Sequence, residues 1–86
     1  MAYISTFFGI VIRMFYREHR PPHFHAEYQG MEGEFDFEGQ LLKGNLKSHT
    51  AAQLIRQWAQ LHKAELEANW RKIERKETLD KIEPLM

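Results

Sequence analysis

The part of this 86-residue chain with the most potential for chemistry is the stretch EHRPPHFHAEY, which runs from Glu18 to Tyr28. It holds three histidines, two adjacent prolines and two carboxylates. Neutral imidazole is a good ligand for iron, zinc, nickel and copper. His23 and His25 are two residues apart, so on an extended strand they would share one face. The pair therefore predicts part of a metal site or of an acid–base site.

The partners of these histidines depend on the hairpin that the following residues form. The sequence YQGM, residues 28–31, predicts a two-residue turn at Gln29 and Gly30, because glycine supplies the positive φ that such turns need. Tyr28 then pairs with Met31, Glu27 with Glu32, Ala26 with Gly33, His25 with Glu34, Phe24 with Phe35, and His23 with Asp36. A shift of one residue would move every side chain to the other face.

This register predicts one apolar face, which carries Phe24 and Phe35, and one polar face on which the histidines are displayed beside carboxylates. The candidate metal ligands on the polar face are His23, His25, Glu27, Glu34 and Asp36. Two histidines and one carboxylate suit a divalent transition metal, which would be the cofactor. The alternative is a surface ladder of histidine–acid pairs without metal, each worth about 0.2–1 kcal/mol.

Catalysis without a metal is a third reading of the same face. A histidine beside a carboxylate can act as a general base, and Arg13 or Arg20 could stabilise a developing negative charge. The candidate catalytic residues are therefore His23, His25 and Arg13. The chain has no cysteine, no G-x-S-x-G and no phosphate-binding glycine loop, so the sequence does not support covalent or nucleotide-loop chemistry.

Residues 1–45 predict the sheet that would carry this site. The segment 9–16, GIVIRMFY, has a single charge and is rich in β-branched and aromatic residues, as a largely covered strand would be. A second strand begins at His23, after two prolines that cannot donate to a ladder. The segment 34–38, EFDFE, alternates acid and aromatic side chains, and residues 41–42 could form a short fourth strand. We expect an α+β fold with a small, mostly antiparallel sheet of three or four strands.

Residues 48–76 have a helical period, and Ser48 or Thr50 could be the N-cap. Such a helix, packed on the apolar face of the sheet, would be roughly 43 Å long, whereas a seven-residue strand is roughly 23 Å. Either the helix breaks near His62 and folds back, or its distal half meets another subunit. We favour the second, which predicts a homodimer with interaction residues Trp58, Trp70 and Ile73. The tail, residues 77–86, has apolar side chains spaced to dock but could equally fray.

Length and composition limit the remaining possibilities. Eighty-six residues make one domain, 1–86, and no apolar run is long enough to span a bilayer. We expect a cytoplasmic protein with no membrane partner. Twelve basic and twelve acidic side chains balance, so the net charge does not favour nucleic acid. The charges are unevenly distributed along the chain, because residues 27–38 hold five acids and no base, whereas residues 71–76 hold four bases and one acid. The two segments are either solvated faces or charged patches that guide self-association or the binding of a partner.

The chain resembles a bacterial family described as domain of unknown function 4160. The resemblance rests on an E-H-x-P-P-H-x-H motif at Glu18, His19, Pro21, Pro22, His23 and His25, and on a helix motif at Trp58, Glu65, Leu66, Asn69 and Trp70. It implies a small cytosolic protein encoded beside another small protein, in an arrangement similar to toxin–antitoxin pairs. His49 stands where many relatives have arginine, which argues against an anion-binding role at this position.

We therefore expect an interaction module of a toxin–antitoxin-like pair, whose partner is a small protein encoded by a neighbouring gene. The alternative is a metal-dependent hydrolase or nuclease that uses His23 and His25, with Glu27 or Asp36 as the carboxylate.

Overall fold

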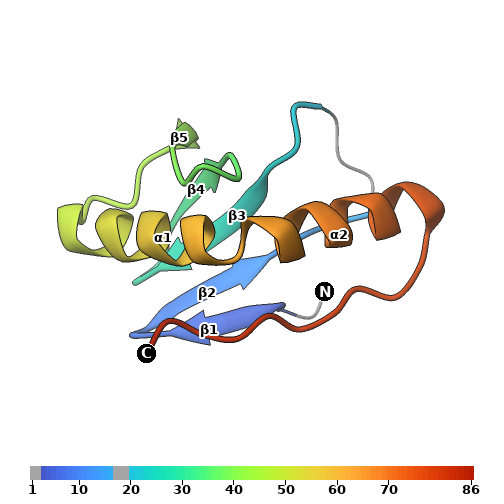
Figure 1. The fold of residues 1–86 in the computed structure, drawn as a ribbon. Helices are drawn as coiled ribbons and strands as arrows, with labels where there is room; N and C mark the ends of the chain where they lie inside the picture. The colour runs from blue at the N-terminus through green and yellow to red at the C-terminus, as the bar shows by residue number, and fades with distance from the viewer. Residues whose placement is uncertain (1–2, 17–19) are drawn as a thin grey trace.

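The computed structural model describes residues 3–16 and 20–86 of the chain. It is an α+β fold in which two helices cover one face of an antiparallel sheet (Figure 1). The strands are β1 (Ser5–Phe7), β2 (Ile10–Arg13), β3 (Phe24–Tyr28), β4 (Met31–Phe35) and β5 (Leu41–Gly44), and the helices are α1 (His49–Leu61) and α2 (Lys63–Arg75). Each strand pairs with its neighbours in the sequence, in the order β1-β2-β3-β4-β5.

The sheet has five strands rather than the three or four expected. Strand β1 was missed, and β2 is shorter than the predicted 9–16 segment. The reason is a tight turn at Phe8 and Gly9, which have φ values of 51° and 79°. Positive φ at both central residues is typical of hairpin turns, but phenylalanine rarely adopts it. The residue types in this apolar run therefore do not predict the turn.

The hairpin of β3 and β4 has the predicted register. Gln29 and Gly30 form the turn with φ values of 49° and 80°. His25 pairs with Glu34, and Phe24 pairs with Phe35, whose rings stack with centroids 5.7 Å apart on the helix side. The described ladder ends at this pair, so His23 and Asp36 are not cross-strand partners, and that part of the prediction is wrong.

The helical segment begins as expected, because the Ser48 hydroxyl accepts a hydrogen bond from the Ala51 N–H at 3.1 Å and caps α1. It is interrupted at His62, with φ −117° and ψ 25°, instead of forming one regular helix. The His62 N–H is shared between the carbonyls of Trp58 and Ala59, at 3.0 and 3.2 Å. Helix α2 therefore continues nearly in line with α1 and does not fold back (Figure 1).

The expected interaction residues are all inside the molecule. Trp58, Trp70 and Ile73 are 0%, 6% and 5% exposed. Their burial removes the reason for placing them at a subunit interface, because the distal half of the helix is covered within one chain. A homodimer would have to use other side chains.

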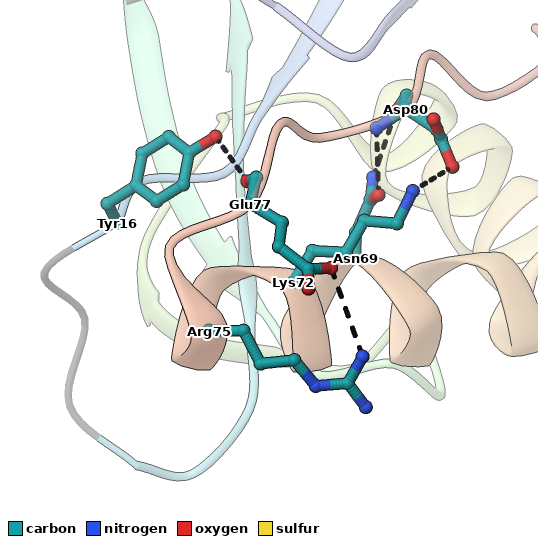
Figure 2. Close-up of polar contacts among 6 residues, drawn as sticks. All are labelled: Tyr16, Asn69, Lys72, Arg75, Glu77 and Asp80. Carbon is teal, nitrogen blue, oxygen red and sulfur yellow. Dashed lines mark hydrogen bonds and ion pairs between the residues drawn. The ribbon is translucent and has the colours of Figure 1, made fainter.

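The C-terminal segment, residues 77–86, helps to cover the distal helix by returning along it and along β1 (Figure 1). Ile82 is buried, and its N–H donates to the Ile4 carbonyl at 2.8 Å. The Trp58 indole N–H donates to the Glu83 carbonyl at 2.8 Å, and the Tyr16 hydroxyl donates to the Glu77 carbonyl at 2.7 Å (Figure 2). Of the two possibilities for the tail, the structure has the docked one.

Candidate metal centre

Three of the predicted ligands come together at one end of the β3–β4 hairpin. His23, His25 and Glu34 each offer a ligand atom, and these three atoms lie within 4.8 Å of one another. His25 and Glu34 are brought together by the cross-strand register, and His23 directly precedes β3. Two imidazole nitrogens and one carboxylate oxygen form a donor set suited to zinc, iron, nickel or copper.

The orientation of His23 favours metal binding. Its Nδ1 is 2.8 Å from the Pro21 carbonyl oxygen, which can only accept a hydrogen bond. This contact assigns a proton to Nδ1, so that in the neutral ring the lone pair is on Nε2, which is 3.9 Å from Oε1 of Glu34. Histidine ligands of metals commonly donate their second ring N–H to a backbone carbonyl, which fixes the ring and its tautomer.

The two histidines differ in exposure. His23 is only 2% exposed, so the prediction that both histidines are displayed is wrong for this residue. The Trp70 ring from α2 packs against it at 5.8 Å between centroids, and the His25 ring lies at 5.2 Å on another side. His23 precedes the strand, where the strict alternation of faces does not apply. His25 is half-buried, and the Phe15 ring meets it edge-on at 4.7 Å.

The other two candidate carboxylates have different partners. Glu27 accepts a hydrogen bond from Nη1 of Arg13 at 2.7 Å, so these two side chains form an ion pair on the open face of the sheet. Oδ1 of Asp36 accepts from the backbone N–H groups of Glu38 and Gln40, both at 2.9 Å, and stabilises the turn before β5. Within residues 3–16 and 20–86, the carboxylate beside the histidines is therefore that of Glu34, rather than Glu27 or Asp36.

The cluster borders two hollows on the open face of the sheet. One has a volume of about 340 Å³ and is lined by Arg13, Phe15, His25, Ala26, Glu27 and Glu32. The other has a volume of about 180 Å³ and is lined by His25, Glu32, Gly33, Glu34, Lys43 and Gly44. His25 lines both, so an ion at the cluster would be reached from the open face while His23 holds it from the buried side.

Sequence reasoning missed the support of His23 by the Pro21 carbonyl and the Trp70 ring. The adjacent prolines were a signal for the first, because they constrain the approach to β3. Nothing local connects Trp70 with His23, since 47 positions separate 23 from 70.

Glu18 and His19 of the motif lie outside the described residues. His62 lies at the helix junction, where its Nδ1 is 2.5 Å from Oε1 of Glu65.

A comparison with protein families places this site in a known sequence context. The model described as Domain of unknown function (DUF4160) matches residues 9–71, which is more than half of the chain. The chain belongs to the DUF4160 family. The DUF4160 match includes His23, His25 and Glu34, and it leaves out β1 and the C-terminal segment.

Two further comparisons return no relative: no curated protein and no solved structure has a significant match to this DUF4160 chain. Among residues 3–16 and 20–86, the structure has no helix that is both long enough and apolar enough to cross a membrane.

Proposed function

We propose that this DUF4160 protein binds a divalent transition metal ion through His23, His25 and Glu34 and uses it in a hydrolytic reaction. The observation that supports this most directly is the convergence of the three ligand atoms within 4.8 Å. The hydrogen bond from His23 to Pro21 is a second support, since it sets the tautomer that a metal needs. Three protein ligands leave coordination positions open for water and substrate.

The side chains around the cluster have separate roles in this proposal. A divalent ion bound there would supply a Lewis acid and activate water near neutral pH. His25 and Glu34 would hold the ion at the edge of the hollows, and His23 would bind it from the buried side. Arg13 lines the larger hollow with guanidinium donors that could hold a negatively charged group of the substrate, and Glu27 fixes its position.

The charges of the larger hollow favour a small substrate over nucleic acid. Arg13 is the only arginine or lysine that lines it among the described residues, and it already pairs with Glu27, while Glu32 adds a further carboxylate. Apart from a bound ion, the described lining of this hollow therefore offers a polyanion no unpaired arginine or lysine for its phosphates. A hydrolase that acts on a small molecule therefore fits the site better than a nuclease.

The experiment that tests the metal proposal is elemental analysis of untagged protein, with wild type beside a His23→Ala/His25→Ala double variant. A matched control is His49→Ala, because His49 is an exposed histidine at the start of α1, away from the cluster. We expect stoichiometric metal in the wild type and the control, and none in the double variant. A folded wild type that contains no metal and takes up none from added zinc, nickel or iron would contradict the proposal.

A second candidate function is the interaction module of a toxin–antitoxin-like pair, with a small cytosolic partner encoded by a neighbouring gene. The observation that favours it is strand β5, whose four residues are all exposed at one edge of the sheet. Co-expression with the neighbouring gene product followed by size-exclusion chromatography tests this candidate. A stable complex that persists in the His23→Ala/His25→Ala variant would support it separately from the metal proposal, and two separate peaks would contradict it.

A further inference from the structure

We propose that docking of the C-terminal segment, residues 77–86, raises the affinity of the metal site, and that Trp70 connects the two as a positioning residue for His23. This inference rests on the metal site of the proposed function and adds a means of regulation to it. Anything that displaces the segment from α2 would weaken metal binding, and bound metal would in turn hold the segment in place.

Two adjacent residues of α2 contact the two places that this proposal connects. Asn69 binds the backbone of Asp80 in the C-terminal segment through two hydrogen bonds (Figure 2). The Trp70 ring packs against the ring of His23, with the centroids 5.8 Å apart. Both side chains of α2 are buried, so this turn of the helix cannot shift without changing both contacts.

Trp70 is held in place by packing. Its indole N–H is buried and has no hydrogen-bond partner within the part of the chain that the structure describes. The ring meets Phe37 edge-on at 6.2 Å and lies tilted against His23. Because a buried indole usually donates a hydrogen bond that fixes it, the position of this ring depends more than usual on the position of α2.

The C-terminal segment ties the distal helix to the edge of the sheet. Nζ of Lys72 donates to Oδ2 of Asp80 at 2.6 Å, next to the Asn69 contact (Figure 2). Further along the segment, Ile82 is buried in the core, and its N–H donates to the Ile4 carbonyl beside β1. Without these contacts, α2 would lose a covering layer on the side away from His23 and would be held less firmly on the core.

His23 is the metal ligand that depends most on α2. His25 and Glu34 face each other as a cross-strand pair, whereas the described ladder of β3 and β4 does not include His23. Its ring is oriented by the Pro21 carbonyl, 2.8 Å from Nδ1, and by the Trp70 ring. Loss of a group that orients a metal ligand commonly lowers metal affinity 10- to 100-fold. A displaced Trp70 should therefore weaken metal binding without any change in the ligands.

The test measures the zinc dissociation constant of the full chain by competition with a chelator, in the wild type, Asn69→Ala and Lys72→Ala. We expect the dissociation constant to rise about tenfold in Asn69→Ala and less in Lys72→Ala. Loss of the Lys72 charge would by itself favour a cation, so weaker binding in this variant would report the coupling. The matched control is Gly30→Ala, which strains the β3–β4 turn without touching the segment and should keep the affinity of the wild type.

The reciprocal effect is a readout that a merely structural loss would not give. The Trp58 indole N–H donates to the Glu83 carbonyl, so its NMR signal reports whether the segment is docked. In Asn69→Ala we expect this signal to be displaced without zinc and to return toward its wild-type position at saturating zinc. Trp70→Phe, which keeps an aromatic ring beside His23, should retain more zinc affinity than Trp70→Ala.

Wild-type zinc affinity in folded Asn69→Ala would overturn the proposal and leave the metal site standing, as would an equal loss of affinity in Gly30→Ala. A displaced Trp58 signal that zinc does not move would also overturn it. If Asn69→Ala does not fold, Lys72→Ala, which keeps the buried contacts, decides the same comparison. A wild type that binds no zinc would overturn this inference, and the proposed function falls with it only if nickel and iron are not bound either.

Discussion

The side-chain amide of Asn69 and the backbone of Asp80 form a reciprocal pair of hydrogen bonds (Figure 2). Asn69 Nδ2 donates to the Asp80 carbonyl at 2.9 Å, and the Asp80 N–H donates to Oδ1 of Asn69 at 3.0 Å. Asn69 is 1% exposed, so both bonds are shielded from water. The Asn69 side chain of α2 thus makes the two hydrogen bonds that a paired strand would make with the Asp80 backbone. These bonds hold the C-terminal segment on the core.

This pair predicts that Asn69→Ala destabilises the protein. The substitution leaves backbone groups of Asp80 without their partners, which should lower the free energy of unfolding by about 1–3 kcal/mol. Urea denaturation measures the change, and Gln60→Ala, which removes an exposed amide from α1, should stay within about 0.5 kcal/mol of the wild type. Equal losses in the two variants would mean that the segment is not held by this contact.

The metal proposal predicts that stabilisation of the protein by zinc depends on the carboxylate of Glu34. Zinc at about 100 times its dissociation constant should raise the free energy of unfolding of the wild type by about 2.7 kcal/mol, because only the folded chain has the assembled site. Glu34→Gln should lose most of this stabilisation. Glu27→Gln should keep it, since Glu27 binds Arg13 instead of the cluster. Thermal unfolding with zinc and with EDTA measures the difference, and a reversed order of the two variants would assign the ligand to Glu27.

Gly30 and Gly39 have similar φ values, but their replacement by alanine should lower the free energy of unfolding by different amounts. Gly39 has φ 85°, and a Cβ there would lie 2.6 Å from Cα of Arg56 in α1. Gly30 has φ 80°, but a Cβ there would meet nothing within 4 Å. Gly30→Ala should therefore cost only the strain of a left-handed conformation, about 1–2 kcal/mol. Gly39→Ala should cost more, because the α1 backbone must also move, and chemical denaturation of both variants measures the contrast. Equal costs would show that the contact with α1 adjusts freely.

The exposed pair of Lys63 and Glu38 predicts a pH dependence in the alkaline range. The hydrogen bond that Lys63 donates to Glu38, and then the negative charge of Glu38, raise the pKa of Lys63 above the ordinary value of 10.5. The folded state therefore favours the charged lysine, so the stabilisation is complete below pH 10.5 and is lost as the pH rises through the raised pKa. An NMR titration of the Lys63 side chain should give a higher midpoint in the wild type than in Glu38→Gln. Identical midpoints would show that the ion pair does not persist in solution.

Local chemistry accounts for the features that were predicted correctly. The hairpin register follows from the turn at Gln29 and Gly30, because a two-residue turn determines which residues face each other. The start of α1 follows from Ser48, whose hydroxyl is within reach of the first free N–H groups. Strand β1 was not predicted, because the turn after it uses Phe8, a residue type that does not indicate positive φ.

The sequence by itself determined the α+β class, the β3–β4 pairing of His25 with Glu34 and the start of the helical segment, since each depends on side-chain period or on residues close in the chain. Only the tertiary structure decided that Trp70 covers His23, that the cluster uses Glu34 while Glu27 and Asp36 bind elsewhere, and that the C-terminal segment buries the helix expected at an interface. The physical reason is that these contacts join residues far apart in the sequence. Their formation depends on how the helices and the C-terminal segment pack on the sheet, which no local pattern encodes.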